Sequence, residues 1–181
     1  MQNHSTPSVE FTVDEASDDP LAEIDHLMQK RVDEERRSTA RSAELLADRV
    51  EFSAQFSALC DQQVRPRMEE IIERLRRNGG DGAIEELPED ESLRRGHRLI
   101  LWMSLDGEII GTPRQDRHPY LQLDADVDKR SVSVSEGDMW QGHGGNRSGR
   151  VGEWRISEIT PALVTKEALA VLRRSVRAPS T

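Results

Sequence analysis

Residues 97–109, HRLILWMSLDGEI, decide the fold class of this chain. The run from Leu99 to Met103 is apolar at every position, which is typical of a central strand with both faces covered. Asp106-Gly107 follows it, and this dipeptide between apolar segments is a strong signal for a tight hairpin. The stretch therefore predicts antiparallel β-structure in the middle of the sequence.

Three later segments continue the period-two pattern. They are YLQLDADV at 120–127, SVSVS at 131–135 and VGEWRISEI at 151–159. In the first, Leu121, Leu123, Ala125 and Val127 alternate with polar residues, as in a half-buried strand. Together with the hairpin, these segments predict an antiparallel meander of about five strands.

The sequence before residue 80 is helical in character. No Gly or Pro occurs from Leu21 to Arg65. Asp19-Pro20 is a typical helix start, and Asn78-Gly79 after a run of arginines is a typical helix end. We predict a long N-terminal helical arm that is kinked or restarted at Pro66, because proline disrupts a helix interior.

The arm has two apolar faces. The first follows a straight-helix period and comprises Leu21, Ile24, Met28, Val32, Ala43, Leu46, Val50, Ala54, Ser57, Cys60, Val64, Met68, Ile71 and Leu75. The second comprises Leu45, Phe52, Phe56 and Leu59. A small sheet with one further helix covers only one face well, so we expect these four residues to form an interface with a second copy or another protein.

The first face is interrupted between Asp33 and Ser42, DEERRSTARS. One interpretation is a solvated stretch of a continuous helix. The other is a break near Ser38, where Ser38 or Thr39 would cap a second helix. With such a break the arm folds back as a hairpin, and residues 21–32 cover the second face within the same chain.

These patterns divide the chain into five parts. We expect a disordered acidic tail at 1–18, the helical arm at 19–79, a linker at 80–94, an α+β head domain at 95–177 and a frayed tail at 178–181. The head closes with a helix that begins at Thr165, with Thr160-Pro161 as the alternative start. The predicted fold class is α+β.

Composition excludes several classes of function. The net charge is −9, and acidic and basic residues are nearly balanced along the arm, so no basic stripe is available for nucleic acid. Cys60 is the sole cysteine, which excludes an intrachain disulfide. The first residues lack the pattern of a signal peptide, and no apolar run is long enough to span a membrane. We expect a cytoplasmic protein with no membrane or nucleic-acid partner.

One glycine-rich stretch, MWQGHGGNRSGRVGEW at 139–154, is a candidate ligand site. Its glycines allow positive φ angles and leave backbone N–H groups free. Donors for a phosphate or carboxylate would be His143, Asn146, Arg147 and Arg150, beside Trp140. We interpret 141–150 as a flexible loop between two strands, and anion binding is the alternative.

Metal and catalytic motifs are not recognisable. Asp124, Asp126 and Asp128 alternate, but an EF-hand loop would need Gly and Glu where Lys129 and Ser135 stand. The histidines lack metal-site spacing, although His97, His118, His143, Asp116 and Asp138 would meet if neighbouring loops converged. No nucleophile motif is present. The sequence indicates no metal and no cofactor.

The leading hypothesis is a non-catalytic interaction or scaffold protein, most simply a homodimer, that self-associates or docks a partner through its helical arm. The alternative is a small-molecule or anion-binding domain, catalytic or not, with its site around 141–150.

Overall fold

The computed structural model of the chain describes residues 20–89, 96–107, 109, 111–113, 118–139 and 146–177. The tails predicted at 1–18 and 178–181 lie outside the described residues. The chain divides into two compact units, Met1–Glu44 and Leu45–Thr181. The second unit holds the sheet and the end of the long helix, and all contacts between elements discussed below belong to it.

Helix α1 runs without interruption from Pro20 to Leu59. In its middle, the Thr39 hydroxyl donates to the Glu35 carbonyl and the Ser42 hydroxyl donates to the Ser38 carbonyl, each at 2.9 Å. Hydroxyls bonded in this way to the preceding turn of their own helix do not cap a new one. The predicted continuous helix is therefore correct, and a break near Ser38 does not occur.

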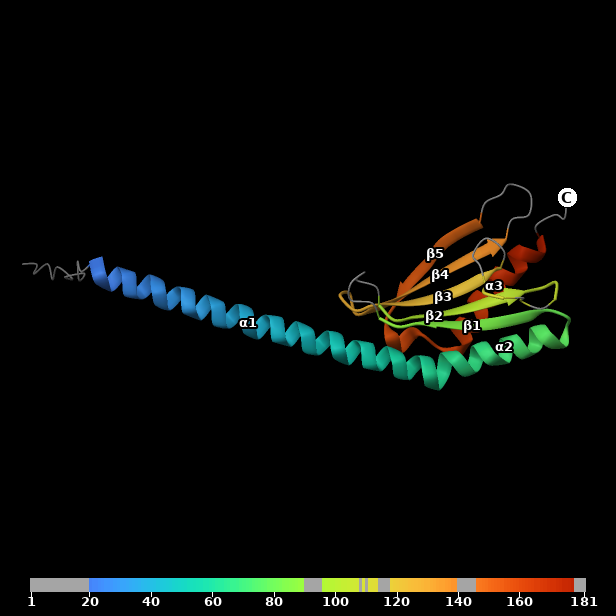
Figure 1. Ribbon diagram of the computed structural model, residues 1–181, viewed down its shortest axis with the longest axis horizontal. Helices are drawn as coiled ribbons and strands as arrows, with labels where there is room; N and C mark the ends of the chain where they lie inside the picture. The colour runs from blue at the N-terminus through green and yellow to red at the C-terminus, as the bar shows by residue number, and fades with distance from the viewer. Residues whose placement is uncertain are drawn as a thin grey trace, which may run out of the picture. The chain divides into compact units, whose positions relative to one another are not determined.

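A π-helix, η1 (Cys60–Val64), joins α1 to α2 (Arg65–Arg77). Pro66 has no N–H, and its ring would clash with the carbonyl of a regular preceding turn. The wider turn relieves this clash, and the Arg65 N–H bonds to the Cys60 carbonyl, five residues back. Figure 1 shows the helix axis changing direction here, which confirms the predicted kink at Pro66.

The end of α2 follows the sequence signal. Asn78 caps the helix, with its side-chain amide donating to the Arg74 carbonyl at 2.7 Å. Gly79 then takes a φ of +85°, a left-handed conformation that glycine adopts without steric cost. The chain can therefore turn directly from the helix into the sheet.

The sheet has five antiparallel strands in the order β1-β2-β3-β4-β5. Their bounds are β1 Asp81–Leu87, β2 Arg98–Ser104, β3 Tyr120–Asp126, β4 Ser131–Met139 and β5 Asn146–Trp154. This is the antiparallel meander predicted from the sequence, and the α+β fold class is confirmed. Strand β1, however, occupies the range 80–94 in which we expected a linker.

Strand β2 pairs with β1 and β3 rather than with a segment directly after Asp106-Gly107. Gly107 does turn the chain, with a φ of +106°. Among the residues that the structure describes, the next strand begins at Tyr120 and β2 pairs with β1 and β3, so β2 forms no tight hairpin at this dipeptide. The dipeptide signal thus located a turn correctly but not the pairing that follows it.

The chain ends in helix α3 (Pro161–Arg177), after a short 3-10 helix, η2 (Ile156–Glu158). The Leu163 N–H donates to the Thr160 hydroxyl at 3.2 Å, so Thr160 is the capping residue. The start expected at Thr165 is therefore wrong, and the alternative at Thr160-Pro161 is correct. Thr165 lies inside the helix, where its hydroxyl bonds to the Pro161 carbonyl.

Helices α2 and α3 cover the same face of the sheet (Figure 1). The core between them is formed by the inward residues of the strands together with one side of the α1–η1–α2 segment. Its fully buried members include Phe56, Val64, Met68, Leu99, Leu101, Met103, Leu121, Leu123, Val132 and Val171. A smaller cluster of Ile100, Trp102 and Tyr120 lies apart from this core.

Candidate functional site

The residues expected at an interface lie mostly inside the molecule. Phe52, Phe56 and Leu59 retain 5%, 0% and 8% of their surface, and they pack in the core of the sheet-containing unit. The Phe56 ring also packs edge-on against His97, with ring centroids 5.3 Å apart. Of the four residues only Leu45 is exposed, at 58%. The second apolar face of α1 is therefore the core-facing side.

The reason is the size of the side chains and the π-turn. Burying a phenylalanine removes far more apolar surface from water than burying Ala54 or a serine. Buried residues then recur every fourth position, at Phe52, Phe56, Cys60, Val64, Met68 and Ile72. A regular helix would carry this series steadily around its axis. The wider turn of η1 counteracts that rotation and keeps the series on the sheet.

The first apolar face of α1 is correspondingly exposed. Leu46 and Val50 expose 61% and 63% of their surface. Earlier along the helix, Leu21, Ile24, Met28 and Val32 expose 67%, 54%, 55% and 38%. We call these six residues the exposed apolar face of α1.

A groove of about 760 Å³ lies beside Leu46 and Val50. Its walls are Leu46, Arg49, Val50, Ser53, Ala54, Ser57, Glu89 and Asp128. Two contacts close its rim: the Arg49 guanidinium lies 3.5 Å from the Asp128 carboxylate, and the Ser53 hydroxyl donates to Glu89 at 3.1 Å. The groove thus combines apolar and small side chains of α1 with a charged border from the sheet's loops.

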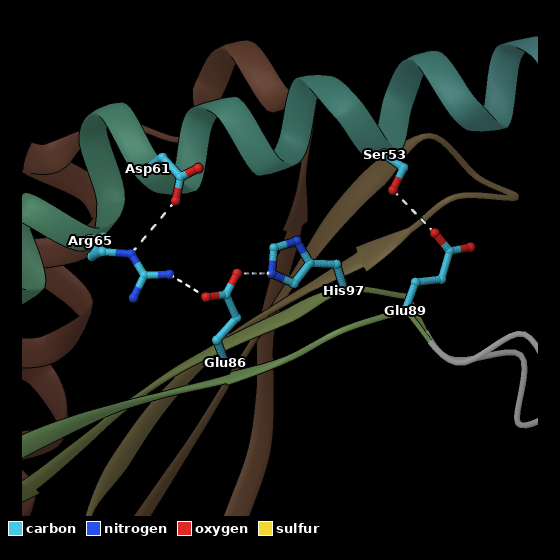
Figure 2. A network of polar contacts seen from close by, with 6 residues as sticks. All are labelled: Ser53, Asp61, Arg65, Glu86, Glu89 and His97. Carbon is cyan, nitrogen blue, oxygen red and sulfur yellow. Dashed lines mark hydrogen bonds and ion pairs between the residues drawn. The ribbon is translucent and has the colours of Figure 1, made fainter.

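A polar network next to this groove fastens the helix to the sheet (Figure 2). Glu86 of β1 accepts hydrogen bonds from Arg65 at 2.5 Å and shares one with His97 Nε2 at 2.7 Å. Asp61 lies 3.7 Å from the other side of the Arg65 guanidinium. The buried His97 and the half-buried Arg65 therefore both depend on one carboxylate.

Electrostatics in this network favour the ionised carboxylate. Burial alone would raise the pKa of Glu86, but the hydrogen bond and charge of Arg65, with His97, hold that pKa below its usual range. Burial, together with the nearby carboxylates of Glu86 and Asp61, raises the pKa of the neighbouring Cys60 thiol to about 12. Cys60 is therefore a protonated thiol at neutral pH, unsuited to nucleophilic attack.

In the described part of the network no hydroxyl or thiol is hydrogen-bonded to a histidine, the base that most often activates such a nucleophile. The Ser53 hydroxyl donates to Glu89, and His97 Nε2 faces Glu86 rather than a hydroxyl or thiol. What the arrangement does physically is to hold the α1–α2 junction against β1 and β2. The groove and the exposed apolar face of α1 adjoin this anchored junction.

The glycine-rich candidate site is only partly described. Trp140 and His143 lie outside the described residues. Asn146, Arg147 and Arg150 belong to strand β5, so half of the expected loop 141–150 is a strand paired with β4. Arg150 is exposed, and its guanidinium bonds to Glu153 at 2.6 Å. The side chains of Asn146 and Arg147 lie outside the described part of the structure, so anion binding at this stretch stays a prediction.

The histidines and aspartates that would meet if neighbouring loops converged are only partly described, and the strand order separates two of them. His143 and Asp116 lie outside the described residues. His97 precedes β2 and His118 precedes β3, and because these strands are antiparallel the two histidines lie at opposite ends of the pair. Among the residues that the structure describes, no group of three His, Cys, Asp or Glu side chains is placed to hold a metal ion.

A second groove, of about 350 Å³, runs between α2 and α3. Its floor is apolar and includes Ile71, Leu75, Ala168, Leu169 and Leu172. Arg67 and Arg74 stand at its border, and Arg67 is held by the Thr165 hydroxyl at 2.6 Å. Sequence reasoning missed this groove, because its two walls come from helices that are distant in the chain.

Comparison with known proteins identifies no matching family, no similar curated protein and no similar solved structure. Within the described ranges, no helix combines the length and apolar character needed to cross a membrane.

Proposed function

We propose that this chain is a non-catalytic interaction protein that self-associates through the exposed apolar face of α1. The observation that carries the proposal is the exposure of Leu46 and Val50, each above 60%, on a helix that packs in the core only through Phe52, Phe56 and Leu59 near its end. Apolar side chains of this size stabilise a folded state by about 1.5–3 kcal/mol each when they are fully buried. An exposed row of them favours association.

The surroundings of these two residues suit a helix as the partner. Ala43, Ala47 and Ala54 are exposed beside them, and such small side chains allow a second helix to approach closely. The neighbouring polar groups are already satisfied within the chain, since Arg49 pairs with Asp128 and Asp48 pairs with Arg130. A second helix can therefore cover Leu46 and Val50 without breaking either of these ion pairs.

A second copy of the chain is the simplest partner. Two-fold symmetry covers an exposed patch with itself and is the commonest arrangement of soluble oligomers. In this proposal α1 is the association element and the sheet-containing unit is the part that is brought together in pairs.

The test replaces Leu46 and Val50 together by glutamate and measures mass in solution by light scattering. Two negative charges on the proposed interface should convert the self-associated protein to single chains of 20.5 kDa. The fold of the sheet-containing unit should be retained, which far-UV circular dichroism checks, because both residues are exposed in the single chain and contribute little to its core.

The matched control is the pair Arg37→Glu and Arg41→Glu. These residues have the same four-residue spacing, are exposed, and lie on the far side of α1 from Val50 by helical periodicity. The control should keep the mass of the unmutated protein. Loss of association in both variants, or in neither, would contradict the proposed surface.

A further inference from the structure

We propose that two α1 helices pair antiparallel, with the two-fold axis passing beside Thr39, so that residue n of one copy faces residue 78 − n of the other. The inference rests on the proposed function, which supplies the second copy as the partner. It adds the direction and the register of the pair. The argument comes from the spacing, size and charge of residues on the exposed side of α1.

The spacing of this face is symmetric about Thr39. Going outward in both directions, the helix presents Glu35 and Ala43, Val32 and Leu46, Met28 and Val50, Ile24 and Ala54, and Leu21 and Ser57. The separations from Thr39 are four, seven, eleven, fifteen and eighteen residues, each close to a whole number of helical turns. All these positions therefore lie on one side of the uninterrupted helix.

The repeat length fits a nearly straight pair. Steps of eleven residues connect Met28 to Thr39 and Thr39 to Val50. An eleven-residue repeat matches the natural period of the helix more closely than a heptad does, so it imposes little supercoiling. Two such helices can remain in contact along their length without bending around each other.

Residue sizes favour the antiparallel direction. In the proposed register Ile24 faces the exposed Ala54, and Leu21 faces the half-buried Ser57. Ile24 and Leu21 then each meet a small side chain, while Val32 meets Leu46 and Met28 meets Val50. A parallel pair in register would place Ile24 against Ile24 and Ala54 against Ala54. The two isoleucines would then be crowded and the two alanines would leave a void, whereas a stable interface is closely packed throughout.

Charge favours the same direction. Two Glu35 carboxylates would face each other in a parallel pair in register, whereas in the antiparallel pair each faces the methyl group of Ala43. Opposed helix dipoles add a further favourable contribution.

The available length of helix is sufficient for a stable contact. From Leu21 to Ser57 the helix rises by roughly 54 Å, and a strip as wide as a helix gives on the order of 600 Å² for each copy. This approaches the ~800 Å² per partner of a standard stable interface.

The test uses engineered cysteines in the full chain. Met28→Cys protein and Val50→Cys protein, one carrying a mass tag, are mixed and oxidised with oxidised glutathione. The antiparallel register places these two positions opposite each other, so a disulfide should join one tagged and one untagged chain. Each variant alone should give no linked dimer. The native Cys60 is buried with a raised pKa and should not react.

The control pair is Arg37→Cys mixed with Arg41→Cys. These positions also sum to 78, but they lie on the side of α1 away from Thr39 by helical periodicity, and they should not link. Linked dimers formed by Met28→Cys alone would show a parallel pair and overturn the inference, while the proposed self-association would stand.

Two further outcomes separate the claims. A solution mass of two chains without any mixed disulfide would overturn the register alone. A single-chain mass for the unmutated protein, again without disulfide, would overturn both the inference and the proposed function.

Discussion

Phe52 and Phe56 determine which side of α1 faces the sheet. The sequence has two apolar faces on this helix, and their spacing does not indicate which of them packs on the sheet. Side-chain size decides this: the structure buries the two phenylalanines and exposes Val50 and Ala54. Reasoning from periodicity extended the first face through Cys60, because a constant helical period was assumed where η1 interrupts it.

Replacing Phe56 by alanine should therefore act on folding rather than on association. Phe56 is fully buried and touches His97, so its truncation should lower the free energy of unfolding by about 3–5 kcal/mol. Val176→Ala in α3 is the control and should change that free energy by less than about 0.5 kcal/mol, because its side chain is 69% exposed and lies outside the proposed interface. Urea unfolding measures both, and equal losses would place the two residues in the same environment, contrary to the structure.

Glu86 should make the stability of the sheet-containing unit depend on acid pH. Its pKa is lower in the folded chain than its ordinary value of 4.5, so its contribution is complete above about pH 4.5 and is lost as pH falls through the lower folded value. Glu86→Gln should give a protein whose free energy of unfolding falls less steeply in this range. The comparison needs urea unfolding at about pH 7 and about pH 3.5, and equal slopes for both proteins would contradict the ion pair with Arg65.

At the scale of elements, local sequence signals predicted most ends of helices and strands but not which strands pair with each other. Asn78-Gly79 ends α2 as expected, and the alternation of 120–127 and 131–135 produced β3 and β4. Strand β1 was missed because Gly82 and Glu86 lie among its inward positions and break the apolar alternation. Its existence depends on β2 and α2, which are tertiary contacts that a local pattern does not contain.

Gly82 shows how closely β1 and α2 pack. A methyl group at this position would come within 2.6 Å of Ile72 Cγ1 and 3.0 Å of the Trp102 carbonyl oxygen. Gly82→Ala should therefore cost about 1–3 kcal/mol of unfolding free energy through overpacking. Gly149→Ala in β5 is the matched control, because nothing lies within 4 Å of the added group and no positive φ is involved. A loss of the same size in both variants would argue against close packing at Gly82.

At the scale of the whole molecule, the sequence predicted an α+β chain with a long helix, and the structure confirms this. The candidate interface was predicted on the wrong side of that helix for three of its four residues, and only Leu45 is accessible. The groove beside Val50 was beyond sequence reasoning, because Glu89 and Asp128 reach it from separate loops of the sheet. Surface features of this kind form only when distant segments are brought together by folding.

The central claim is that the chain self-associates through α1, and sedimentation equilibrium of the unmutated protein tests it most directly. At concentrations on the order of tens of micromolar, where association worth ~8 kcal/mol is already populated, the measured mass should be twice the 20.5 kDa of one chain and should fall toward 20.5 kDa on dilution. A mass of 20.5 kDa throughout that range would contradict the account.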